Sequence, residues 1–104
     1  MSHTCTTGSW KPTAGKQDMF VAAWSELAAW AGGMPGAGTL RLARDTRDPE
    51  RFVSFAAWDS IEAVRAWKSA PDFRARLARV LQHVAEFEPS ELKVVATAEK
   101  EPET

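Results

Sequence analysis

The sequence predicts an α+β fold of the ferredoxin-like, split βαβ type, in which a four-stranded antiparallel sheet carries its helices on one face. Two observations predict it. Segments typical of strands and helices follow one another in the order strand, helix, strand, strand, broken helix, strand. The 104 residues suffice for one hydrophobic core but not for two. We therefore expect a single domain over residues 1–98 and a disordered, charged tail over residues 99–104.

The first strand and the first helix are predicted from composition and periodicity. The segment Thr4–Trp10 is rich in threonine, which favours a strand, although its hydrophobic pattern is weak. Residues Lys11–Gly15 have the composition of a loop. Lys16–Ala31 is predicted to be a helix because large apolar side chains recur at positions i, i+4, i+7 and i+11. These side chains are Phe20, Trp24, Leu27 and Ala31.

A hairpin is predicted in the middle of the chain. Leu40 and Leu42 alternate with polar residues in Ala37–Arg44, which indicates a strand. Asp45–Glu50 contains an Asp-Pro pair and reads as a turn, and Arg51–Trp58 is the next strand. Arginines at 41, 44, 47 and 51 form either a solvated hairpin tip, since acidic residues are interleaved with them, or an anion site.

The broken helix has recognisable start and stop signals. Asp59 or Ser60 is a suitable N-cap for a helix over residues 60–68, and a proline at position 71 forces a bend. A second helix is predicted over Pro71–Glu86, with an inward stripe of Phe73, Leu77, Val80, Leu81 and Val84. The last strand is predicted over Ser90–Thr97.

The predicted strand Arg51–Trp58 is apolar on both sides. Phe52, Ala56 and Trp58 lie on one side, and Val53, Phe55 and Ala57 lie on the other. A strand with one solvated face would alternate with polar residues. No element of the chain is left to cover the second face, so we expect a homodimer in which two sheets pack face to face.

Composition narrows the range of partners and locations. The net charge of −1 gives no general reason to expect binding to nucleic acid or to an anionic membrane. No apolar run approaches the roughly 20 residues that a membrane span requires. The one cysteine, Cys5, excludes an internal disulfide, and the polar N-terminus lacks a signal peptide pattern. These features favour a reducing cytoplasm.

Several motifs together resemble the antibiotic biosynthesis monooxygenase superfamily of dimeric α+β barrels. The resemblance covers about residues 3–97. The matching segments are Trp10 with Pro12 and Gly15-Lys16, Phe20–Trp24, Pro35–Gly38, Asp48-Pro49 with Arg51–Phe55, Trp58–Ser60, Trp67 with Ser69 and Phe73, and Phe87–Pro89. The superfamily includes cofactor-free oxygenases of polycyclic aromatics, quinol monooxygenases and haem-degrading enzymes.

The resemblance also permits a comparison of residues associated with chemistry. The haem-degrading branch has an asparagine on the first strand, a tryptophan at the end of the second helix and a histidine ten residues later. Only the tryptophan is kept, as Trp67, while Gly8 and Leu77 occupy the other two positions. Without the imidazole, haem iron would lack its axial ligand, so we expect no productive haem degradation. The polyketide-type oxygenases add a tyrosine, and this chain has none.

We expect an apolar ligand pocket between the helices and the sheet. Trp24, Trp67 and Phe73 are its predicted aromatic walls, and Leu77 is included because of the position it takes in the resemblance. Gly8 is placed on the floor, because a missing side chain on a central strand leaves room for a ligand. Trp67 is equally interpretable as a core residue, and Gly8 as a bulge or a site of close packing.

Other candidate groups carry weaker signals. His83 is predicted to face solvent, since Arg79, Gln82 and Glu86 surround it in sequence. His3 and Cys5 form a His-x-Cys pair, but strong metal sites need about four ligands, so no metal site is predicted. Cys5 has no visible partner that would stabilise a thiolate.

Three functional hypotheses remain open at this point. The first is a cofactor-independent monooxygenase of an electron-rich aromatic molecule or quinol, in which the substrate itself supplies electrons to dioxygen. The second is a non-catalytic module that binds a small apolar molecule in the same pocket. The third is a structural dimer without a vacant pocket. Cavity volume separates the third from the others, and a titratable side chain in the cavity separates the first two.

Overall fold

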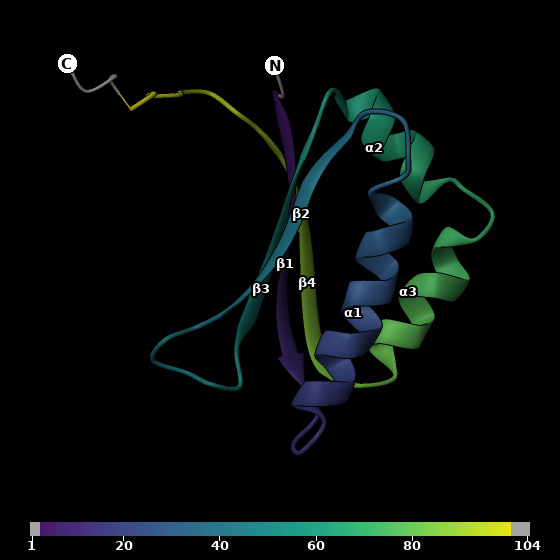
Figure 1. Cartoon of the computed structure of the whole chain (residues 1–104), viewed down its shortest axis with the longest axis vertical. Coiled ribbons are helices and arrows are strands. Elements are labelled where there is room, and N and C mark those ends of the chain that lie inside the picture. The colour runs from purple at the N-terminus through teal and green to yellow at the C-terminus, as the bar shows by residue number, and fades with distance from the viewer. Residues whose placement is uncertain (1–2, 101–104) are drawn as a thin grey trace.

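The computed structural model describes residues 3–100 and confirms the predicted α+β fold. Its elements are β1 (Thr4–Pro12), α1 (Gln17–Ala31), β2 (Ala37–Arg44), β3 (Phe52–Trp58), α2 (Ile61–Lys68), α3 (Phe73–Leu81) and β4 (Val84–Lys93). The strands form one antiparallel sheet in the order β2-β3-β1-β4. All three helices lie on the same side of this sheet (Figure 1).

The register of the sheet decides which side chains face the helices. Thr6 of β1 pairs with Ala56 of β3 and with Glu91 of β4. Every second residue of β1 from Thr4 to Trp10 is buried, and the residues between them are half-buried. Because side chains alternate along a strand, the buried set faces the helices and the other set faces the uncovered side.

The end of α3 and the start of β4 differ from the sequence prediction. The helix ends at Leu81, not at Glu86, and the strand begins at Val84, not at Ser90. Val84 pairs with Pro12 at the end of β1. The residues that the periodicity assigned to the end of the helix therefore belong to the sheet. Sequence periodicity misled the prediction because Val84 also fits the helical spacing after Val80.

Two consequences follow from the earlier start of β4. Phe87, which the prediction placed before the final strand, lies in it and stacks on Trp10, with ring centroids 3.9 Å apart. Pro89 lies in the same strand opposite Gly8. A proline is tolerated there because β4 is an edge strand of the described sheet and needs no outward N–H bond.

The helix caps and the bend follow the sequence signals. Ser60 is the N-cap of α2, and its hydroxyl accepts a hydrogen bond of 3.1 Å from the backbone N–H of Ala63. The chain turns between Lys68 and Phe73, around the predicted break at Pro71. At the other end of the sheet, β1 extends to Pro12 through a register shift, two residues beyond its predicted end.

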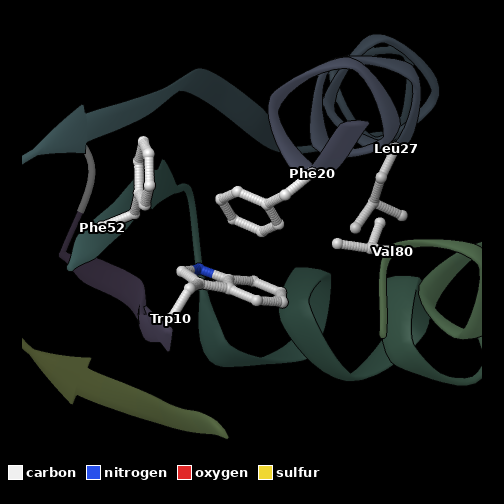
Figure 2. Close-up of a cluster of buried hydrophobic side chains, with 5 residues drawn as sticks. All are labelled: Trp10, Phe20, Leu27, Phe52 and Val80. Carbon is white, nitrogen blue, oxygen red and sulfur yellow. The ribbon is translucent and has the colours of Figure 1, made fainter. Parts of the chain in front are cut away.

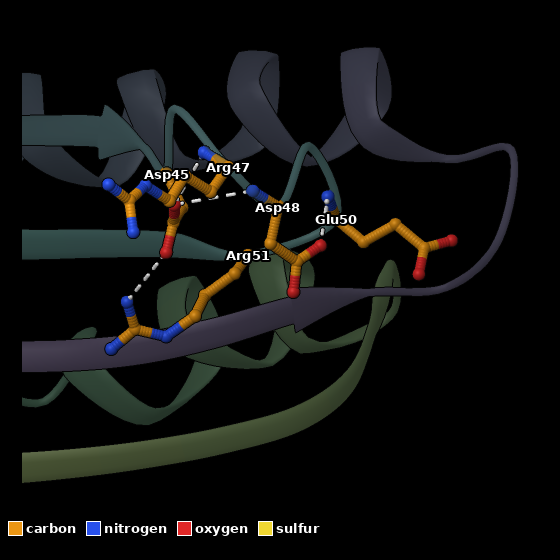
Figure 3. Close-up of polar contacts among 5 residues, drawn as sticks. All are labelled: Asp45, Arg47, Asp48, Glu50 and Arg51. Atoms are coloured by element: carbon orange, nitrogen blue, oxygen red, sulfur yellow. Dashed lines mark hydrogen bonds and ion pairs between the residues drawn. The ribbon is translucent and has the colours of Figure 1, made fainter.

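The β2–β3 turn is organised chiefly by the carboxylate of Asp45, while that of Asp48 accepts a hydrogen bond of 3.0 Å from the backbone N–H of Glu50 (Figure 3). The Asp45 carboxylate makes more contacts. Its oxygens accept hydrogen bonds from the backbone N–H groups of Arg47 and Asp48, at 2.8 and 3.2 Å, and from the Arg51 guanidinium at 3.2 Å. The bond from Arg47 is the largest cause that holds the pKa of Asp45 below its ordinary value. Arg44 lies over the ring of Phe52. The hairpin tip is therefore exposed to solvent, and it is stabilised by hydrogen bonds and an ion pair within the turn.

The core consists of two clusters rather than one. Figure 2 shows the first, in which Phe20 lies between Trp10 and Phe52, at centroid distances of 5.4 and 5.2 Å. Leu27 and Val80 complete it. The second cluster contains Ala31, Ala56, Trp58, Val64 and Trp67. Both clusters join side chains of the sheet to side chains of the helices.

The C-terminal segment leaves the body of the fold. Residues 94–100 form neither helix nor strand, and Figure 1 shows them extending away from the helices. The predicted disordered tail falls largely on residues 101–104, which lie outside the described residues. No helix in the described range is both long and apolar enough to span a bilayer.

Candidate functional site

A cavity of about 200 Å³ lies between the helices and the sheet. Its wall draws on both core clusters: Trp10 and Leu27 come from the first, and Ala56 and Trp67 from the second. Most of the remaining lining is apolar, and α1, α2, α3 and all four strands contribute to it. An engineered apolar cavity of about 150 Å³ binds benzene, so this volume suits a ligand of one or two rings.

The five pocket residues predicted from the sequence all line this one cavity. They are Gly8, Trp24, Trp67, Phe73 and Leu77. Trp24 comes from α1, Trp67 from α2, and Phe73 and Leu77 from α3, while Gly8 lies on the central strand β1. The structure therefore brings them together, and their role in binding a ligand remains a prediction.

Trp67 lies among other aromatic rings at the end of α2. Its indole stacks on Trp58, with centroids 4.8 Å apart, and meets Phe73 edge to face at 5.0 Å. The side chain is 9% exposed, so it belongs to the core and to the cavity wall at once. Both alternatives left open by the sequence therefore describe the same residue.

The indole nitrogens of the buried tryptophans differ in their partners. Nε1 of Trp10 donates to the Ser54 hydroxyl at 2.8 Å, and Nε1 of Trp58 donates to the Thr6 hydroxyl at 3.0 Å. Nε1 of Trp67 is buried and has no partner among the described residues. An unsatisfied buried donor is costly, so this N–H would gain from an acceptor atom on a ligand.

Gly8 makes room for a neighbouring side chain as well as for the cavity. A Cβ atom at this position would lie 2.7 Å from Nε1 of Trp10 and 2.9 Å from Oγ of Ser54. Any side chain there would collide with the Trp10–Ser54 hydrogen bond. The close approach of the indole is therefore a sufficient reason for glycine at this point of β1.

Two hydroxyl groups on the cavity wall keep a free donor. Thr6 and Ser54 line the cavity, and each hydroxyl accepts an indole N–H. A hydroxyl has one O–H donor besides its acceptor lone pairs. No hydrogen bond donated by either hydroxyl occurs within the described residues, so both remain able to donate to a ligand oxygen.

Lys68 is the single ionisable side chain among the described residues that line the cavity. It follows Trp67 at the end of α2, and its Nζ lies 2.8 Å from Oε1 of Glu91 on β4. Hydrogen bonding by Lys68, more than its charge alone, lowers the pKa of the Glu91 carboxyl. The pair is partly exposed, which places it at the rim.

The other candidate groups lie away from the cavity. His3 is exposed, and Cys5 is half-buried on the uncovered face of the sheet. His83 does not simply face solvent as predicted, because its Nδ1 is buried without a partner in the described chain. Across residues 3–100, no three His, Cys, Asp or Glu side chains are arranged to hold a metal ion.

Comparison with known proteins places the chain in a family. Residues 5–90 match the family described as antibiotic biosynthesis monooxygenase. The chain belongs to this family. No curated protein gives a significant match to the sequence.

Solved structures of this family share the fold. A variant of SnoaB, a cofactor-independent oxygenase from Streptomyces nogalater, superposes with a TM-score of 0.87 at 16% identity, covering 96% of this chain and 100% of that one. A candidate antibiotic biosynthesis monooxygenase from Chloroflexus aurantiacus is 27% identical, with a TM-score of 0.75 and coverage of 94% and 98%. Its counterpart from Nitrosomonas europaea is 18% identical, with a TM-score of 0.77 and coverage of 89% and 99%.

Sequence reasoning missed several residues that line the cavity of this family member. They are chiefly Trp10, Ser54, Lys68 and Phe87. Phe87 was missed because β4 was predicted to start too late.

Proposed function

We propose that this chain is a cofactor-independent monooxygenase of a small, electron-rich aromatic molecule or quinol. The observation that carries the proposal is the apolar cavity between helices and sheet, walled by Trp24, Trp67 and Phe73. Its lining matches what a small-molecule site requires, namely mostly apolar side chains with a few polar groups. Family membership supports oxygenase chemistry at this position.

The chemistry can be written so that the substrate supplies all the electrons. For a naphthalene-1,4-diol, the diol and dioxygen give 2-hydroxy-1,4-naphthoquinone and water. One oxygen atom replaces hydrogen at a ring carbon and the other leaves as water, while the ring loses four electrons in total. The aromatic walls would hold the ring planar and exclude bulk water. Donors from Thr6 and Ser54 would hold its oxygens.

Oxygen consumption tests the proposal. We expect the protein to accelerate dioxygen uptake by naphthalene-1,4-diol well above its autoxidation in buffer, with the hydroxynaphthoquinone as product. A Trp67→Leu variant should lose this acceleration, whereas Trp30→Leu, a tryptophan outside the cavity lining, should keep it. Isotopic oxygen from ¹⁸O₂ should appear once in the product. Uptake equal to autoxidation across a panel of one- and two-ring quinols would refute catalysis.

One observation favours a non-catalytic binding module as the alternative. The described lining holds no histidine or carboxylate, and a general base is the usual means of activating such a substrate. In this case the same ligands would raise the thermal stability of the protein without being consumed. Ligand binding without turnover would select this alternative over the oxygenase.

We also propose that the protein works as a homodimer through the uncovered face of its sheet. Phe55 and Leu92 lie on that face and are 41% and 48% exposed, and Val94 just beyond β4 is 37% exposed. Figure 1 shows no helix on this side. Interfaces of this obligate kind often bury more than about 2,000 Å² in total.

The single cysteine is the reason that we propose a reducing, cytoplasmic location.

Light scattering tests the dimer. The wild-type protein should return a dimer mass at micromolar concentration, and Leu92→Asp should return a monomer, because a charge would be buried in the interface. Met19→Asp is the matched control, since Met19 is an exposed apolar residue of α1 on the helical side. A monomer mass for the wild-type protein would overturn the proposal.

A further inference from the structure

We infer that the ligand of this cavity is a one- or two-ring aromatic acid, whose anionic group is paired with Lys68 at the rim. The inference rests on the proposed ligand site and adds the class of molecule that it selects. It is carried by two observations: the size of the cavity and the kind of polar atoms on its wall. Neither depends on the oxygenase chemistry.

The polar side chains among the lining residues include groups that can only donate hydrogen bonds. The Lys68 ammonium and the Trp67 indole N–H can only donate. The hydroxyls of Thr6 and Ser54 each accept one indole N–H, so each keeps its O–H to donate and one lone pair to accept. No carboxylate of the described chain lines the cavity. Two donor-only groups and no carboxylate in the described lining favour a molecule whose oxygen atoms are acceptors, such as carbonyl, phenolate or carboxylate.

The position of Lys68 also favours a ligand that carries a negative charge. Its ammonium lies at the rim and is held by Glu91 at 2.8 Å, as a ligand carboxylate would hold it. An anionic group at the rim would leave the aromatic body inside, against Trp24 and Leu77. Glu91 therefore takes the place of the ligand's acid when the site is empty, and the incoming acid competes with it for Lys68.

The volume sets the size of the aromatic body. About 200 Å³ exceeds what benzene needs but falls below the roughly 300–1,000 Å³ of common ligand sites. A naphthalene ring is the appropriate scale. Tricyclic and tetracyclic bodies would require the walls formed by α1 and α3 to move apart, which the buried Leu27 and Val80 between them oppose.

Calorimetric titration at neutral pH with 2-naphthoate and its uncharged isostere 2-naphthamide tests the inference. We expect the wild-type protein to bind the acid up to about fivefold more tightly than the amide, as a partly exposed ion pair allows. Lys68→Met should remove this preference, so that the variant binds acid and amide equally. Glu91→Gln should instead tighten acid binding, because Lys68 loses its internal partner. Anthracene-2-carboxylate should bind more weakly than 2-naphthoate.

The matched control is Lys93→Met, which removes a lysine charge from β4, outside the cavity lining. It should leave the acid preference intact. Equal binding of acid and amide by the wild-type protein would overturn the inference while the proposed pocket survives. The inference is also overturned if Lys93→Met abolishes the preference as fully as Lys68→Met. Absence of binding by both probes would overturn the pocket itself.

Discussion

Replacing Gly8 by alanine is expected to destabilise the protein, although a glycine-to-alanine change in a strand normally does the opposite. The added Cβ would lie 2.7 and 3.0 Å from two atoms of the Trp10 indole and 2.9 Å from the Ser54 hydroxyl. The indole cannot simply move away. It is 4% exposed, stacks on Phe87 at 3.9 Å and packs against Phe20.

The magnitude follows from three contributions. Overpacking in a filled core typically costs about 1–3 kcal/mol. Loss of the Trp10–Ser54 hydrogen bond adds about 0.5–1.5 kcal/mol, since both groups are partly buried. The lower entropy of the unfolded alanine chain offsets about 0.4–1 kcal/mol. The net destabilisation is therefore about 0.5–4 kcal/mol, which for a domain of this size lowers Tm by between about 2 and 32 °C.

Urea denaturation followed by tryptophan fluorescence measures this change, and near-ultraviolet circular dichroism reports whether the Trp10 environment has moved. Gly33→Ala is the matched control, because a Cβ there meets only one backbone oxygen, at 3.4 Å. Its stability should stay within about 0.5 kcal/mol of wild type, as for other substitutions away from special sites. A Gly8→Ala protein as stable as this control would show that the indole does not rest against Gly8.

Three further substitutions test separate parts of the structure. Thr6→Val removes the acceptor for Nε1 of Trp58, and leaving that buried donor unpaired should cost about 1–3 kcal/mol in urea denaturation; an unchanged midpoint would refute the bond. Ser60→Ala removes the α2 cap and should cost about 1 kcal/mol by the same assay, whereas a neutral result would assign capping elsewhere. The pair with Lys68 lowers the pKa of Glu91, so its stabilisation is present above the ordinary value of 4.5 and is lost as pH falls through the folded value. In acid unfolding, the Glu91→Gln variant should not lose this stabilisation as the pH falls, whereas the wild-type protein should. The same loss of stability with pH in both proteins would contradict the prediction.

The fold was predictable from the sequence because its strongest signals are local. The stripe of Phe20, Trp24 and Leu27 fixes α1 within one residue of its predicted start. The Asp-Pro pair at 48–49 and the cap at Ser60 mark the two turns that separate β2, β3 and α2. Each of these signals depends on neighbours in the sequence, so no knowledge of the tertiary structure was needed.

The boundary between α3 and β4 was not predictable in this way. Val84 continues the helical stripe of α3, and the sequence contains no glycine there to end the helix. What ends the helix is pairing of Val84 with Pro12, some seventy positions earlier in the chain. Such a long-range pairing overrides a local pattern, and it carries Phe87 onto Trp10. The cavity wall on the β4 side was missed for the same reason.

The candidate site combines residues whose positions arise in different ways. Thr6 and Ser54 reach the cavity because the β1–β3 register places both on the helical face, next to the indoles that they accept. Trp10 and Trp58 are thereby fixed by hydrogen bonds as well as by packing. Trp67 is fixed by packing alone, and its N–H is left without a partner among the described residues. Two of the three buried indole N–H groups, those of Trp10 and Trp58, thus have hydrogen-bond acceptors. The third, that of Trp67, belongs to a residue on the cavity wall and adds nothing to core stability through hydrogen bonding. An acceptor atom of a bound ligand would pair with the Trp67 N–H. When 2-naphthoate binds, the Trp67 indole N–H resonance should therefore shift most among those of the five tryptophans in an NMR titration.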